Sequence, residues 1–417
     1  MSDHPHAQNH ARQKHQSPGF IRGTRGQVWQ RAQLRNDEDT SRERRVGWLE
    51  LFFDLVFVVV ISQLSHHLAK HLDATGVLQF IALFVPVWWV WIGGMYYAER
   101  FETGDLSFRL FIFLQMLPVA GMALTVPHAF DGHWAQFATT YILARLIIIF
   151  LWWRGARHDP SFGPTAVRFN TGFVISVIFW SFSLFTSLEV SIGLAVTGLV
   201  FDLTTPWTTI EQQSRLPRLS SSHLPERFGL FVIIVLGEAI IAVVNGVAQS
   251  ESLEWPVLLN GVLGMILVFA IWWVYFDFVG RRTPKPQISS TLPWSYLHMP
   301  LVIGISASSA GALSAFGGEL NDAVRWLMAG ATAVKLISIG LIEYTLQRDP
   351  GEPTHEHLSP MLKFFGAALA LLLGVFGTNL NLTAFLFALL VPTLIQILYG
   401  LFVWFNRYPE SLGADLP

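Results

Sequence analysis

Acidic side chains that interrupt long apolar runs are the residues of this sequence most able to do chemistry. Glu50 and Asp54 are four residues apart in the apolar run 47–70, so on a helix they share one face. Two carboxylates this close disfavour joint ionisation, so the pair would hold a proton or bind a cation. The alternative is an anchoring role, through ion pairs with Arg44, Arg45 or a neighbouring helix.

Three further ionisable residues lie deep within apolar runs, namely Glu238, Arg145 and Lys335. A charged side chain in hydrocarbon is costly, so it usually finds a partner or marks a path for ions. We therefore predict two buried ion pairs, one in each half of the chain. Arg145 would pair with Asp54 or Glu50. Lys335 would pair with Glu238.

Other polar residues in the apolar runs carry weaker signals. His298 lies early in the run 294–316, where serines that follow would line a solvated cavity or allow close helix packing. Asp277 lies near the inner end of its run, where contact with the membrane interface accounts for it. The same interpretation covers three further residues: Glu99, Arg100 and Asp202.

Histidines gather near the outer ends of two apolar runs, and neutral imidazole is a common metal ligand. A metal or proton-sensing site there is one hypothesis, and ordinary interfacial placement is the other. The sequence contains no cysteine, so a metal would need His, Asp or Glu ligands, and thiolate chemistry is excluded. The histidines in question are His66, His67, His71, His128 and His133.

Long apolar segments must position these residues. Hydrophobic residues make up 52% of the 417 and charged residues only 13%, whereas about a quarter of the residues in soluble domains are charged. Runs of 18 or more apolar residues recur, each long enough to cross about 30 Å of hydrocarbon. The sequence therefore predicts an all-α, polytopic transmembrane helical bundle of about 12 spans. The predicted spans are 47–70, 76–98, 108–130, 134–154, 168–186, 189–205, 226–248, 255–279, 294–316, 322–343, 361–379 and 382–405.

The placement of basic residues predicts the orientation. If the N-terminus is inside, the tails, loops and adjoining span ends on that side hold 23 of the 27 Lys and Arg residues, and the loops and span ends on the outer side hold only Lys70. This bias is what the positive-inside rule demands, so we expect both termini in the cytoplasm. The first 46 residues are polar and lack the short apolar stretch and the cleavage site that are typical of a signal peptide.

Weak internal similarity suggests two parallel six-helix repeats, because an even number of spans returns each half to the same side. The matching positions are Glu50 and Glu226, Trp88 and Trp272, Gln115 and Leu297, and Arg145 and Lys335. The chain would then comprise a disordered cytoplasmic tail at 1–46, a first repeat at 47–205, a cytoplasmic linker at 206–225, a second repeat at 226–405 and a cytoplasmic C-terminal tail at 406–417.

Four sequence blocks resemble a known family. They are Gly47-Trp-Leu-Glu-Leu-Phe-Phe-Asp-Leu-Val-Phe-Val, Glu226-Arg-Phe-Gly-Leu-Phe-Val-Ile-Ile-Val-Leu-Gly-Glu238, Trp272-Trp-Val-Tyr-Phe-Asp277 and Trp294-Ser-Tyr-Leu-His298. Together they resemble the bacterial low-temperature-requirement A (LtrA) family, over most of the chain from about 44 to 405. The resemblance implies a multi-pass protein of the bacterial cytoplasmic (inner) membrane, with a link by name to growth at low temperature.

The leading functional hypothesis is a secondary transporter or related permeation protein, whose charged residues line a path between the two repeats. A cation channel is the first alternative, and a membrane-embedded enzyme or a structural membrane protein the next. No compact catalytic motif is present, so no catalytic residue is assigned. The expected partners are the lipid bilayer and a small molecule or ion, with no cofactor and no nucleic acid, and formation of a homo-oligomer stays open.

Overall fold

The computed structural model describes residues 30–35, 46–101, 103, 105–250, 253–316, 320–348, 352 and 354–407. These residues form helices and connecting loops, and the described ranges contain no β-strand beyond one isolated bridge between Pro284 and Leu346. Twelve of the helices within these ranges are long and apolar enough to cross a membrane. The prediction of an all-α transmembrane bundle with about 12 spans is therefore confirmed.

The spanning helices follow one another with short connections, and one five-residue helix, α7, lies in the connection between α6 and α8. Their bounds are α1 Trp48–Lys70, α2 Ala74–Phe101, α3 Leu106–Thr125, α4 Trp134–His158, α5 Gly163–Phe182, α6 Leu188–Thr208, α7 Ile210–Ser214, α8 His223–Ala248, α9 Trp255–Tyr275, α10 Ile288–Phe316, α11 Asp322–Glu343, α12 Leu358–Phe376 and α13 Leu382–Arg407.

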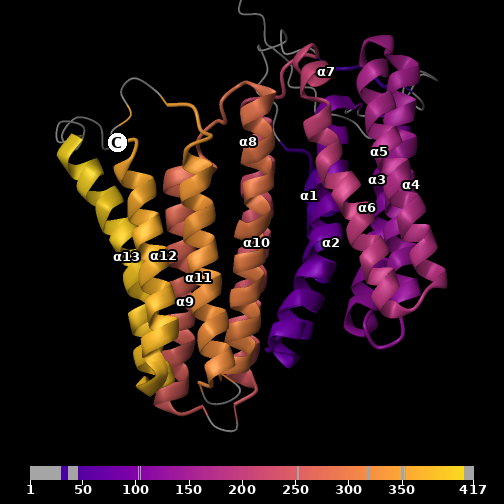
Figure 1. The fold of residues 1–417 in the computed structure, drawn as a ribbon. Helices are drawn as coiled ribbons and strands as arrows, with labels where there is room; N and C mark the ends of the chain where they lie inside the picture. Colours follow the sequence, from indigo (N-terminus) through magenta and orange to yellow (C-terminus); the bar gives the residue numbers. More distant parts are fainter. Residues whose placement is uncertain are drawn as a thin grey trace, which may run out of the picture.

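The two halves of the bundle lie side by side. In Figure 1 the helices α8 to α13 (salmon to yellow) form one side and α3 to α6 (magenta) the other, with α1 and α2 (indigo) between them. The halves meet where α1 packs against α8 and α10. We call the end of the bundle at which α1 and α8 begin the basic end, because the basic residues of the described loops gather there.

Helix neighbours occur in the same order in the two halves. In the first half α1 contacts α2 and α3, and the chain then packs α3 on α4, α4 on α5 and α5 on α6. In the second half α8 contacts α9 and α10, and the same sequence continues from α10 to α13. Two parallel repeats would have this order of contacts, but the repeat itself stays a prediction.

One part of the N-terminal tail packs on the bundle at its basic end. The backbone N–H of Gln30 donates to Asp105 at 2.9 Å, and that of Ala32 donates to His158 at 3.0 Å. Ala32 is fully buried. Residues 30–35 are therefore held against the bundle, while the rest of the predicted tail, 1–29 and 36–45, lies outside the described residues, as does 408–417 of the C-terminal tail.

Asp105 is the N-cap of α3 and ties this segment to the helix, because it also accepts from the backbone N–H of Phe108. Burial alone would raise the pKa of its carboxyl group. Hydrogen bonds from Ser107, Thr103 and the backbone of Gln30 outweigh that effect and hold the pKa of Asp105 below its usual range. The carboxylate therefore keeps its charge, and its hold on the 30–35 segment, at neutral pH.

The predicted linker at 206–225 is more helical than the sequence suggested. Its first residues complete α6, a single turn of helix forms α7, and α8 already begins at His223. The connection that remains, 215–222, runs across the basic end between the two halves. The early start of α8 matters for function because it puts His223 inside the bundle, where it is almost fully buried.

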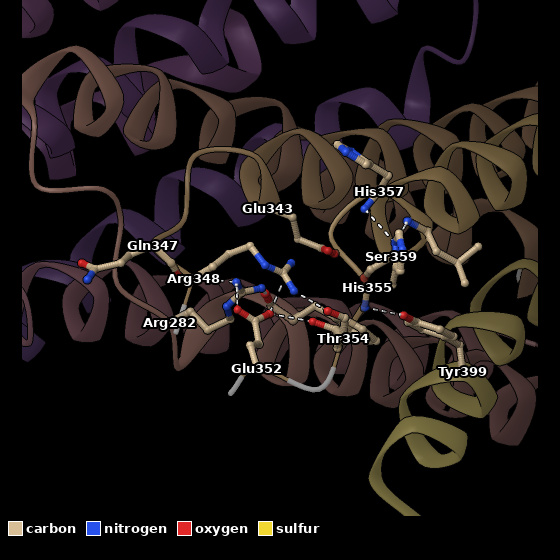
Figure 2. A network of polar contacts seen from close by, with 12 residues as sticks. Arg282, Glu343, Gln347, Arg348, Glu352, Thr354, His355, His357, Ser359 and Tyr399 are labelled. Carbon is tan, nitrogen blue, oxygen red and sulfur yellow. Dashed lines mark hydrogen bonds and ion pairs between the residues drawn. The ribbon is translucent and has the colours of Figure 1, made fainter. Parts of the chain in front are cut away.

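A second polar network ties loops together at the basic end of the second half (Figure 2). Arg282 forms an ion pair with Glu352 at 2.8 Å, and Thr354 donates to the same carboxylate. The backbone N–H of His355 donates to the hydroxyl group of Tyr399 in α13 at 3.0 Å. These contacts join the loops after α9 and α11 to the last helix.

Candidate functional site

A buried set of charges joins the two halves near the basic end. Arg227 of α8 contacts both acidic residues of α1: its Nη1 lies 2.9 Å from Glu50 Oε1 and its Nη2 lies 2.7 Å from Asp54 Oδ1. All three side chains are at most 3% exposed. Trp91 of α2 donates its indole N–H to the same Asp54 oxygen at 2.8 Å. One guanidinium therefore holds both carboxylates of the predicted pair, which lie one turn apart on α1.

His223 extends this set to α2 by bridging two carboxylates. Its Nδ1 lies 2.6 Å from Glu99 and its Nε2 lies 3.2 Å from Glu50. An ionised carboxylate only accepts hydrogen bonds, whereas a neutral imidazole has one N–H. The two contacts can both be hydrogen bonds only if His223 is an imidazolium or one carboxyl group is protonated. If both contacts are hydrogen bonds, His223, Glu50 and Glu99 together hold one proton more than a neutral imidazole and two carboxylates would.

We call Glu50, Asp54, Glu99, His223 and Arg227 the charge cluster. Three helices supply it, α1, α2 and α8, so it closes only when the two halves are docked. Separating its ion pairs would cost free energy, because a buried charge that loses its partner is not hydrated in exchange. A movement of α8 against α1 would therefore change its protonation and pairing.

The ion pair predicted between Arg145 and Asp54 or Glu50 is wrong. Arg145 of α4 instead pairs with Asp202 of α6, with Nη2 2.6 Å from Oδ1, and both side chains are fully buried. The other oxygen of Asp202 accepts from the hydroxyl groups of Tyr141 and Ser176. This pair lies inside the first half, because α4 and α6 both belong to that half.

The pair predicted between Lys335 and Glu238 is also wrong. Lys335 of α11 is buried and donates to the hydroxyl group of Ser308 in α10 at 2.7 Å. It lines a cavity of about 40 Å³ enclosed by α8, α9, α10, α11 and α13. Glu238 is buried on another face of α8, beside Ser62 of α1. Each deep cation thus stays inside its own half.

The two remaining candidates have unlike surroundings. His298 is buried between Phe228 and Trp294, and its Nδ1 lies 2.8 Å from the Trp294 carbonyl oxygen. Since a carbonyl only accepts, Nδ1 carries the proton and Nε2 accepts from the Tyr275 hydroxyl group at 3.1 Å. Asp277 is exposed and accepts from the indole N–H of Trp273. The interfacial interpretation of Asp277 fits this position.

The outer histidines form two small groups rather than one. The rings of His67 and His71 lie 4.9 Å apart, and those of His128 and His133 lie 5.8 Å apart. His66 points along its own helix and hydrogen-bonds to the Ser62 carbonyl oxygen. Within the residues that the structure describes, no three His, Asp or Glu side chains are arranged to hold a metal ion.

Four residues of the charge cluster and of the Arg145–Asp202 pair were misjudged from the sequence. Glu99 and Asp202 were assigned to the membrane interface, and that interpretation is wrong because both are buried in hydrogen-bonded ion pairs. His223 fell within the predicted linker 206–225 and Arg227 at the start of the predicted span 226–248, and neither was given a role. Their spacing was an available signal, since two basic residues four apart match Glu50 and Asp54 on α1.

Comparison with known proteins places the chain in one family. Residues 45–391 match the family model described as bacterial low temperature requirement A protein (LtrA). The chain belongs to this family. An uncharacterized protein of Rhizobium meliloti (strain 1021) is 29% identical over 293 residues, which cover 66% of this chain and 70% of that protein. The match includes α1 to α12 and therefore all residues of the charge cluster.

Proposed function

We propose that this LtrA family protein is a proton-coupled secondary transporter whose path runs between its two halves, with the charge cluster as the coupling element. The observation that carries this proposal is the bridging position of His223, which ties the additional proton to the contact between α1, α2 and α8. Proton uptake or release there changes the attraction between the halves. Transporters built from repeats use relative movement of this kind.

A line of polar groups continues from the charge cluster along the same interface. Glu238 lies eleven residues beyond Arg227 on α8, about 16 Å further along the helix axis. It faces Ser62 of α1, and the next turn of α1 brings Ser65 within 2.8 Å of Ser306 in α10. We take these groups as the continuation of the path, because each lies between helices of different halves.

Flux measurements on the purified full-length chain in liposomes test the proposal. Gradients of Na⁺, K⁺ and Cl⁻ are imposed in turn, and internal pH is followed with an entrapped dye. We expect at least one gradient to drive proton movement above that of empty liposomes. Asp54→Asn and Glu238→Gln should each slow it at least about tenfold, which corresponds to about 1.4 kcal/mol, because a neutral amide cannot exchange a proton.

Asp277→Asn is the matched control, because Asp277 is an exposed carboxylate outside the interface. It should leave the flux unchanged. The family description names a requirement at low temperature, and we propose that transport by this protein supports growth in the cold. In a strain lacking the gene, the Asp277→Asn variant should restore growth at low temperature, whereas the Asp54→Asn variant should not. Equal proton flux in the wild type, Asp54→Asn and Glu238→Gln would refute the proposal.

We also propose that the protein lies in the bacterial cytoplasmic membrane with its basic end and both termini in the cytoplasm. The support is the bias of Lys and Arg toward loops at that end. Reporter fusions can test this. A phosphatase that is active only outside the cytoplasm should be active when fused within the loop 129–133 and inactive when fused within 215–222. The opposite pattern would reverse the topology.

A further inference from the structure

Arg145 lines a cavity whose walls come mostly from the first half and also include Leu292 and Tyr296 of α10. No residue of the charge cluster lines it. The cavity has a volume of about 50 Å³. Its lining includes Trp89, Gly93, Arg100, Arg145, Phe173 and Gln213. A water molecule needs about 10–15 Å³ measured in this way, so the space fits a ligand of about three or four heavy atoms. We call it the Arg145 cavity.

Unused hydrogen-bond donors point to what the cavity holds. Arg145 donates to Asp202 through Nη2, but its Nη1 and Nε have no acceptor among the described residues. The indole N–H of Trp89, which also lines the cavity, likewise has no acceptor in the described part of the chain. Both side chains are at least 96% buried. Buried donors are rarely left unpaired, so a ligand here should supply acceptor oxygens.

The charge of the cavity selects an anion. Arg100 and Arg145 both line it, while Asp202 is engaged by Arg145 and by two hydroxyl groups. The guanidinium carbon of Arg145 lies 4.2 Å from the centre of the Phe173 ring, so an aromatic wall covers one face of the guanidinium. The N–H edge of the guanidinium therefore remains available to a ligand, and the two oxygens of a carboxylate match the geometry of that edge.

Two features provide the space and the access. Gly93 borders Nη1 directly: a Cβ added there would lie 3.4 Å from that nitrogen. A larger cleft of about 640 Å³ opens at the basic end and shares Arg100, Gln213 and Leu216 with the Arg145 cavity. Arg218 and Lys285 also line this cleft, which would attract anions toward the inner cavity.

We propose that the Arg145 cavity is a binding site for a small carboxylate, reached from the basic end and held by Arg145 Nη1 and the Trp89 indole N–H. The carboxylate group meets both unpaired donors, and the small volume limits the ligand to the size of formate or acetate. The inference does not depend on transport, because it concerns binding at equilibrium.

The test uses the purified full-length protein in detergent, titrated with sodium formate and sodium acetate at constant ionic strength. Tryptophan fluorescence and melting temperature report binding, since Trp89 and Trp152 line the cavity. We expect saturable changes with both carboxylates and a much weaker response to sodium chloride. Gly93→Val should weaken binding at least about tenfold, because its methyl groups occupy the space beside Nη1. Trp89→Phe should weaken it less.

Gly193→Val is the matched control, because Gly193 is an exposed helical glycine with open space around it. It should bind like the wild type. If Gly93→Val does not fold, Gly93→Ala replaces it, since its single methyl group makes an ordinary contact with Nη1. The proposal is overturned if no saturable change occurs, if chloride binds as well as acetate, or if the Gly93 variant that folds binds as tightly as the wild type.

Discussion

Replacing Arg227 by methionine should destabilise the protein by about 3–5 kcal/mol, the usual cost of breaking a buried ion pair. The reason is what the change leaves behind. Asp54 and Glu50 are almost fully buried and lose the guanidinium that contacts both of them. The free energy of unfolding in mixed detergent micelles measures the effect, and the melting temperature should fall with it.

A second substitution separates the ion pair from simple loss of packing. Arg227→Met combined with Asp54→Asn removes one stranded charge and should recover a large part of the lost stability. Arg215→Met serves as the surface control, because Arg215 and Glu211 are more than 70% exposed and such pairs contribute about 0–1 kcal/mol. An Arg227 effect no larger than that of Arg215 would mean that water reaches the charge cluster.

The spans could be predicted from the sequence because their signal is local. A run of apolar residues must satisfy its own backbone in lipid, so length and hydropathy suffice to identify a helix such as α1 or α8. The shared face of Glu50 and Asp54 follows from the same local geometry. Their partner does not, because it depends on which helix packs beside α1.

The predicted ion-pair partners were wrong because the prediction had to assume which helices pack against one another. Arg145 and Lys335 were correctly expected to be buried, but each was assigned a carboxylate on a helix that it does not face. Asp202 was misjudged for a different reason. Snorkelling to the interface needs a long, flexible side chain, and aspartate has only one methylene group. A short acidic side chain inside a span is therefore better interpreted as one half of a buried ion pair with a basic residue.

The two buried networks have different structural roles. The charge cluster joins α1 and α2 to α8 and so connects the halves, whereas Arg145 and Asp202 join α4 to α6 within the first half. If the halves move relative to one another, the first network must rearrange and the second need not. Protonation would then act on the charge cluster. The Arg145 cavity would change shape with the movement, because Leu292 and Tyr296 of α10 line it together with residues of the first half.

Replacing Arg145 by methionine is expected to have an effect of similar size, about 3–5 kcal/mol, because Asp202 would lose its only cation among the described residues. The hydroxyl groups of Tyr141 and Ser176 would still donate to Asp202, but two neutral donors do not replace a full charge. Unfolding in mixed micelles again gives the measurement. Adding Asp202→Asn should restore much of the loss.

Lys335→Met supplies the matched comparison, since Lys335 is equally deep but its partner is the hydroxyl group of Ser308. Removing this charge leaves no carboxylate stranded in the described part of the second half, so stability should change little or rise. The two substitutions each remove one buried positive charge, from α4 in the first half and from α11 in the second. A larger loss of unfolding free energy for Arg145→Met than for Lys335→Met would therefore report the cost of leaving Asp202 without its cation. Equal losses would contradict the assignment of Asp202 as the essential partner of Arg145.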